Sequence, residues 1–231
     1  MSQFETIAIV RVHDQDYQPD VIYGAMAEHV DAMFFLAHKV SNPSILEAAA
    51  RQPKCREIRE HRPAKGWNWT RSMWAMLNWA EALKPRFLLY FDEDELPPAR
   101  LDEVLQRWKS GAAPTLWFQF VWTYGDLDHI ISVRSKQFGY HVKAIHWRPG
   151  LAAAASYAWN CPPPLQRSAR VVCPYPVRHT SATTPEQRAL RGRPGRREAK
   201  NRTWERDWPT IPYDPNMTWN DWARGSRSRR P

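Results

Sequence analysis

The sequence is poor in cysteine and has no long apolar run. Its three cysteines, Cys55, Cys161 and Cys173, are odd in number and form no C-x-x-C pair, which argues for free thiols in a reducing compartment. No stretch approaches the roughly 18 consecutive apolar residues that a membrane span needs, and the Ala-rich residues 151–159 are too few. The first residues also lack the basic segment and apolar run of a secretion signal. These absences predict a cytoplasmic protein without a membrane span.

Basic residues are concentrated at one end of the chain. Residues 186–231 hold 12 Lys and Arg against 6 Asp and Glu, a net charge of +6, whereas the other residues hold 21 against 18, or +3. A basic segment attracts polyanions, and its four tryptophans (Trp204, Trp208, Trp219 and Trp222) could either stack on bases or pack onto the protein. A non-enzymatic nucleic-acid-binding protein is therefore one function that the composition allows. A solubilising tail is the other interpretation.

Apolar periodicity in the first 110 residues alternates between strand and helix. Buried strands are predicted at residues 6–12, 32–37 and 86–91, a further strand at 55–60, and amphipathic helices at residues 20–30, 44–51, 69–83 and 101–108. Asn42 is expected to cap the second helix, with Pro43 at its first position. Four such alternations predict an α/β fold with a mostly parallel central sheet and helices on both faces.

The pattern changes after Gly111. Strands are predicted at residues 115–124, 130–134, 138–147 and 170–177 without long helices between them, so this half of the sheet structure should be mixed or antiparallel. A chain of 231 residues can bury one large core. We therefore expect one domain over residues 1–185, with halves at 1–110 and 111–185, followed by a basic tail at 186–231.

Four acidic residues follow the fourth predicted strand. Asp92, Glu93, Asp94 and Glu95 come directly after an apolar run, at the kind of strand end where open α/β sheets bind ligands. Asp92 and Asp94 lie two residues apart, so both carboxylates can face one hard cation after a turn. This spacing suits Mg²⁺ or Mn²⁺ shared with a diphosphate. Acidic loops are also common after strands, and a metal-dependent nuclease or phosphatase would use further carboxylates at such a site.

Other short segments occur in a fixed order around the acidic residues. They are Val12-His13-Asp14, the KGWNWTR run at 65–71, WTYG at 122–125, KAIHWRP at 143–149, and VRH at 177–179 followed by TPEQR at 184–188. Together with the D-E-D-E sequence, they resemble glycosyltransferase family 2 and its GT-A relatives over about residues 6–191. The resemblance implies a GT-A fold, with a nucleotide-sugar half at 1–110 and an acceptor half at 111–185.

The resemblance also implies a role for individual residues. The nucleotide sugar would be held by His13, Asp14, Asn42, Lys65, Asn68, Arg71 and Asp92, where Asn42 stands in for an Asp that the family usually has after its second strand. The metal ligands would be Asp92, Asp94 and His179. The catalytic base would be Asp126, and Asp128 is the second candidate. On the residues alone, the histidines could instead be structural groups at strand ends, and Lys65 and Arg71 could be solvated.

The predicted reaction is sugar transfer from a nucleoside-diphosphate sugar to an acceptor hydroxyl with Mn²⁺ or Mg²⁺. The cation would stabilise charge on the leaving diphosphate. A carboxylate base would give inversion of the sugar's configuration, and its absence would leave a retaining route open. The acceptor is either a saccharide or lipid-linked group or, given the basic tail, a hydroxylated base in DNA. The alternatives are the nucleic-acid-binding protein and the nuclease or phosphatase. The donor and the oligomeric state are left open.

Overall fold

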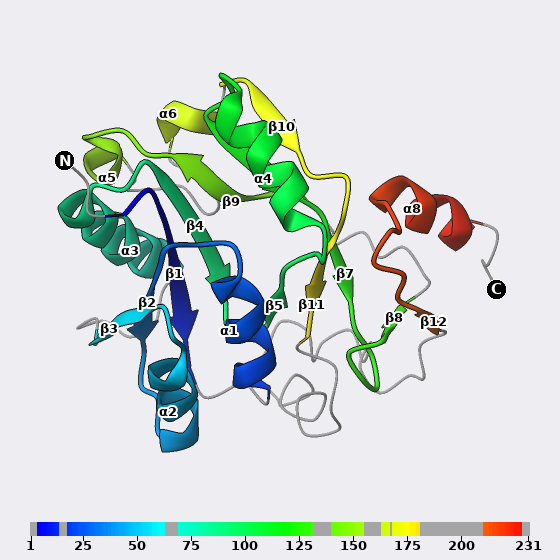
Figure 1. The fold of residues 1–231 in the computed structure, drawn as a ribbon, viewed down its shortest axis with the longest axis horizontal. Helices are drawn as coiled ribbons and strands as arrows, with labels where there is room; N and C mark the ends of the chain where they lie inside the picture. The colour runs from blue at the N-terminus through cyan, green and yellow to red at the C-terminus, as the bar shows by residue number, and fades with distance from the viewer. Residues whose placement is uncertain are drawn as a thin grey trace.

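A central seven-stranded sheet organises the chain. The computed structural model describes residues 4–13, 18–62, 69–131, 140–154, 163–166, 168–180 and 210–227 (Figure 1). The sheet has the order β10-β6-β9-β4-β1-β2-β3. Its strands are β1 (Thr6–Val12), β2 (Ala32–Ala37), β3 (Cys55–Glu60), β4 (Phe87–Asp92), β6 (Thr115–Phe118), β9 (His141–His146) and β10 (Arg170–Val172). Strand β9 is antiparallel to β4 and β6, and the other pairs are parallel. The mostly parallel sheet predicted from the sequence is confirmed.

Helices cover both faces of this sheet, as predicted. One face packs against α1 (Pro19–Ala27), α2 (Pro43–Arg51) and α4 (Leu101–Ser110), and the other packs against α3 (Trp69–Leu83), α5 (Leu151–Ala154) and α6 (Pro163–Gln166) (Figure 1). Side chains along β1 alternate between the two cores, with Val10 in the first and Ile9 in the second. The predicted cap of α2 is also confirmed, because Asn42 Oδ1 accepts a hydrogen bond from the Ser44 N–H at 3.1 Å.

Two predicted strands are each divided in two. The run at 115–124 forms β6 and then β7 (Phe120–Trp122), and the run at 170–177 forms β10 and then β11 (Val177–His179). Pro174 and Pro176 explain the second break, because proline has no N–H to donate to a ladder. The second halves leave the central sheet and build a three-stranded sheet, β5-β11-β7, in which β5 is Glu95–Leu96. The sequence prediction did not include this change of sheet.

The 210–227 segment packs against β7 and against a further strand, β8 (His129–Ile131). Strand β12 (Thr210–Pro212) pairs antiparallel with β8, and α8 (Trp219–Arg227) follows it. The side chains of Trp219 and Trp222 are 7% and 1% exposed, so they belong to the interior. Figure 1 shows α8 beyond β7, on the side of the molecule away from α3. In the part of the chain that the structure describes, no helix has the length and apolar character needed to cross a membrane.

Candidate active site

The acidic turn, residues 92–95, connects β4 to β5. Asp92 is the last residue of β4 and Glu95 is the first of β5. The turn is buried, with Glu93, Asp94 and Glu95 at 0%, 8% and 4% exposure. Carboxylates this deeply buried need charged or hydrogen-bonding partners, since an isolated ion in the interior is strongly destabilising. The partners therefore decide what the turn can do.

Two buried cations hold Asp92. Arg11 lies opposite it in the β1–β4 register and forms an ion pair with its carboxylate. Lys143, on β9, places Nζ 3.6 Å from Asp92 Oδ2 and 2.6 Å from Glu95 Oε2. Burial raises the pKa of Asp92, but the charges of Arg11 and Lys143 outweigh that effect and lower it to about 2. Asp92 is thus an ionised group fixed between two positive charges.

The Glu95 side chain links the two ends of the acidic turn. The Asp92 N–H donates a hydrogen bond to Glu95 Oε2 at 2.8 Å, so the side chain bridges the two ends of the turn. Burial raises the pKa of Glu95 to about 8, and the neighbouring Asp92 and Asp94 charges add to this effect while Lys143 opposes it. We interpret Glu95 as a structural member of the site.

Glu93 ties the turn to the end of β1. Its carboxylate accepts a hydrogen bond from the His13 N–H and contacts His13 Nδ1. Burial lowers the pKa of His13, although the charges of Asp94 and Asp92 oppose the shift. His13, a predicted nucleotide-sugar ligand, therefore lies directly beside the acidic turn, as expected for the residue after β1.

Asp94 meets His179 at the edge of the turn. His179 Nδ1 lies 3.5 Å from Asp94 Oδ2, and the two side chains are 20% and 12% exposed. The backbone fixes this approach, because the Thr180 N–H donates to the Asp94 carbonyl at 2.7 Å and β11 pairs with β5. The indole of Trp122 stacks on the His179 ring with centroids 4.1 Å apart and an angle of 22° between the ring planes. Two predicted metal ligands, 85 positions apart in the sequence, are thus brought together.

This pair suits a divalent cation that a diphosphate also binds. Mg²⁺ sites commonly use one or two carboxylates together with substrate phosphates, and Mn²⁺ accepts carboxylate oxygen and imidazole nitrogen. Two ligands about 2.1 Å from one cation lie roughly 3 Å apart when adjacent, close to the separation here. Among the described residues, no group of three or more His, Cys, Asp and Glu side chains is arranged to hold a metal. Asp92 as a third ligand stays a prediction.

The remaining predicted residues are more scattered. Asp126 lies in the loop between β7 and β8, where its carboxylate accepts hydrogen bonds from the Asp128 and His129 N–H groups, both at 2.8 Å. Asn42 caps α2, and Arg71 lies in the first part of α3. Asp14, Lys65 and Asn68 lie outside the described residues. The base and nucleotide-binding roles of these residues stay predictions.

Three neighbours of the site were given no role in the sequence prediction, although Lys143 and Trp122 begin the KAIHWRP and WTYG segments. Arg11 and Lys143 each lie within a buried stretch of strand, and they are 3% and 4% exposed. A charged residue inside a buried strand requires a buried partner of opposite sign, and that signal could have linked both to the acidic turn. Trp122 carried no such signal, because its contact with His179 depends on the pairing of β7 with β11.

Comparisons with known proteins agree with this architecture. No protein-family model and no curated protein matches the sequence. A 4-diphosphocytidyl-2C-methyl-D-erythritol synthase structure matches with a TM-score of 0.52 at 10% identity, over 80% of this chain and 96% of that one. The fold is GT-A-like. It is the mixed α/β arrangement that GT-A glycosyltransferases and related nucleotidyltransferases share.

Two further structures are similar over about half of this chain. Glucosyl-3-phosphoglycerate synthase from Mycobacterium tuberculosis, solved with Mn²⁺, UDP and phosphoglyceric acid, matches at 11% identity with a TM-score of 0.39. The match covers 52% of this chain and 44% of that one. TarS from S. aureus matches at 12% identity with a TM-score of 0.37, over 53% of this chain and 36% of that one. This chain therefore spans less than half the length of either structure.

Proposed function

We propose that this protein is a divalent-cation-dependent glycosyltransferase that uses a nucleoside-diphosphate sugar. The observation that carries the proposal is the approach of Asp94 to His179, which gives a carboxylate and an imidazole at the carboxyl end of β4. The ordered motifs that resemble glycosyltransferase family 2 place a metal ligand at both positions. The GT-A-like fold is compatible with the proposal, and it is equally compatible with nucleotidyl transfer.

The proposal gives the site residues separate roles. Asp94 and His179 would hold Mn²⁺ or Mg²⁺, which supplies positive charge to the leaving diphosphate. Asp92 is already paired with Arg11 and Lys143. It would assist the cation site by contacting the ribose or a water molecule bound to the cation. His13, next to the turn, would contact the nucleoside together with Asp14 and Asn42, and Lys65, Asn68 and Arg71 would hold the donor.

The acceptor hydroxyl would be deprotonated by Asp126. In this structure its carboxylate orders its own loop and contacts His129 Nδ1 at 2.8 Å, so deprotonation requires the loop to present the carboxylate to an acceptor. A saccharide is the ordinary acceptor. A hydroxylated base in DNA is the second, and it is supported by the net charge of +6 in residues 186–231.

Calorimetry tests the proposal directly. UDP and GDP are titrated into the protein with Mn²⁺, with Mg²⁺ and with EDTA. We expect binding of one nucleotide only with a cation, because the acidic turn alone repels a diphosphate. Nucleotide binding that survives EDTA unchanged would reject the cation role. Incubation with UDP-sugars and GDP-sugars then separates the candidates, since a transferase releases the nucleoside diphosphate, whereas a phosphatase or nuclease releases phosphate or cleaves nucleic acid.

A further inference from the structure

The 210–227 segment contacts the part of the site that carries His179 and Asp126. Strand β12 pairs with β8, and the Tyr213 N–H donates to the Asp128 carbonyl at 2.7 Å. The Trp222 indole N–H donates to the Ile131 carbonyl at 2.9 Å. Trp219 and Trp222 also pack against Val121 of β7 and Ile130 of β8. The segment is therefore attached to both strands that border the Asp126 loop, residues 123–128.

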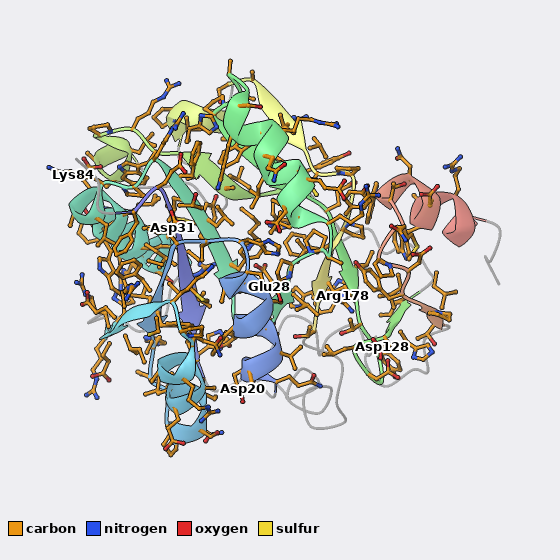
Figure 2. All side chains as sticks on the ribbon, in the orientation of Figure 1. Asp20, Glu28, Asp31, Lys84, Asp128 and Arg178 are labelled. Atoms are coloured by element: carbon orange, nitrogen blue, oxygen red, sulfur yellow. The ribbon has the colours of Figure 1, made fainter. Side chains whose placement is uncertain are left out.

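Arg178 extends this attachment to β11. Its guanidinium lies 4.0 Å from the centre of the Tyr213 ring, and its Nη1 donates to the Leu127 carbonyl at 2.9 Å. Figure 2 labels Arg178 and Asp128, which lie toward the side of the molecule that carries β8 and β12.

Arg178 and His179 are consecutive residues of a strand, so their side chains point to opposite faces. His179 faces Asp94 and Trp122, and Arg178 faces Tyr213 and Leu127. Strand β11 is only three residues long, and its backbone is held by β5, by β7 and by the hydrogen bonds of Thr123 and Thr180. The Arg178 contacts add a side-chain attachment on the face of the strand opposite His179.

We propose that Tyr213 and Arg178 are positioning residues, through which the 210–227 segment holds His179 and the Asp126 loop in place. This inference rests on the proposed function, because it gives the segment a part in the cation site. It differs from a role in acceptor binding, since the contacts run to the protein interior. It also differs from general stabilisation, because the effect should be confined to β11 and its neighbours.

Amide hydrogen exchange tests the inference in the full chain. The reporters are Thr123, whose N–H donates to the His179 carbonyl at 3.1 Å, and Thr180, whose N–H donates to the Asp94 carbonyl at 2.7 Å. In Tyr213→Leu, which removes the aromatic ring under Arg178, both amides should exchange about tenfold faster, while amides of β1 and β2 keep their rates. Tyr213→Phe keeps the ring and should restore wild-type exchange.

Arg59→Met is the matched control. It removes a cation–π contact of similar length, 4.2 Å from the guanidinium carbon to the Trp79 ring, at the β3 edge of the central sheet. It should leave Thr123 and Thr180 unchanged. Unchanged exchange of these two amides in Tyr213→Leu, or equal acceleration in β1 and β2, would overturn the inference.

Mn²⁺ affinity, measured without nucleotide by electron paramagnetic resonance, gives a second readout. Tyr213→Leu should weaken Mn²⁺ binding about fivefold, and Tyr213→Phe should not. Faster exchange of the Thr123 and Thr180 amides with unaltered Mn²⁺ affinity would also contradict the inference, because the substitution at Tyr213 would then not affect the cation site. If the wild-type protein itself binds no Mn²⁺, the proposed function fails, and the exchange experiment alone decides whether Tyr213 positions β11.

Discussion

The candidate site is held by ion pairs on one side and by aromatic contacts on the other. On the charged side, β1, β4 and β9 surround the acidic turn, and Arg11 and Lys143 fix its carboxylates in the interior. On the aromatic side, β7, β8 and β11 carry Trp122 and His179, and the 210–227 segment supports them through Tyr213 and two tryptophans. Asp94 and His179 meet where the two sides join.

The two sides of the site should respond differently to substitution and to pH. Buried charges depend on every partner being present, so losing one leaves an uncompensated ion. Aromatic packing depends on shape and buried area, so losing a ring leaves a cavity. The charged side should therefore respond to pH and to neutral substitutions, whereas the aromatic side should respond to truncation of side chains.

The largest expected effect is on the charged side. Lys143→Met would leave Asp92 and Glu95 without their shared cation and should lower the free energy of unfolding by about 3 to 5 kcal/mol. Urea unfolding measures the change. Lys109→Met is the control, because it removes an amine that is bonded to the Thr6 hydroxyl and lies away from the acidic turn. A loss no greater than in the control would show that Lys143 does not stabilise the buried carboxylates.

Trp222→Ala tests the aromatic side. The indole is 1% exposed and its N–H is bonded to Ile131, so truncation should cost about 3 kcal/mol and loosen β8. The same urea series measures it. The free energy of unfolding that is lost in Trp222→Ala should be the same at pH 4 and at pH 2, whereas the contribution of the charged side should change over that range. A pH-dependent loss would show that the two sides are not separate.

Asp94→Ala should act on binding rather than on the fold. The Thr180 hydrogen bonds use the Asp94 backbone carbonyl, so they survive the substitution. We expect nucleotide affinity in the presence of Mn²⁺ to fall by about 100-fold, as for a lost electrostatic contact at a charged ligand. The thermal transition should stay close to that of the wild type. Collapse of that transition would instead assign Asp94 a structural role.

Acid should weaken the charged side through Asp92. Its pKa in the folded protein is about 2, below the ordinary value of 3.8, so its contribution is present above pH 3.8 and is lost as the pH falls through 2. A shift of this size corresponds to about 2 kcal/mol. Carboxyl NMR titration should give a midpoint near 2 that rises in Lys143→Met. An unchanged midpoint in that variant would show that Lys143 does not hold Asp92.

The smallest effect on stability is expected in the basic tail. Changing Arg227, Arg229 and Arg230 to Gln together removes three charges without touching a tryptophan. If DNA is the acceptor, its affinity should fall and the dependence on salt should flatten, because fewer counterions are released. Unchanged salt dependence in DNA binding would remove this arginine cluster from the acceptor contact. Unfolding should not change.

Much of the fold could be predicted because its signals are local. The β/α alternation, the cap at Asn42 and the acidic turn all follow from neighbouring residues in the sequence. The partners of the turn could not be predicted in the same way. Lys143 meets Asp92 only because β9 inserts antiparallel beside β4, and Trp122 meets His179 only because β7 leaves the central sheet. A lysine inside a buried strand indicates a buried partner, but neither strand pairing can be derived from a short stretch of chain.

The packing of Trp222 shows the same limit. A tryptophan in an Arg-rich stretch is compatible with base stacking and with burial, and composition does not distinguish them. In the structure its indole is buried against β8, so this residue belongs to the protein interior. Trp204 and Trp208 lie outside the described residues, and their roles stay predictions.

In the proposed function, Asp94 and His179 together hold a divalent cation. Electron paramagnetic resonance titration of Mn²⁺ into the wild type, His179→Ala and His129→Ala tests it most directly, because free Mn²⁺ is observed without any nucleotide or acceptor. His129 is the control, since it also pairs with an aspartate, at 2.8 Å, but its partner is Asp126 of the β7–β8 loop. We expect one Mn²⁺ site that is lost in His179→Ala and kept in His129→Ala. Equal Mn²⁺ binding by His179→Ala and the wild type would contradict it.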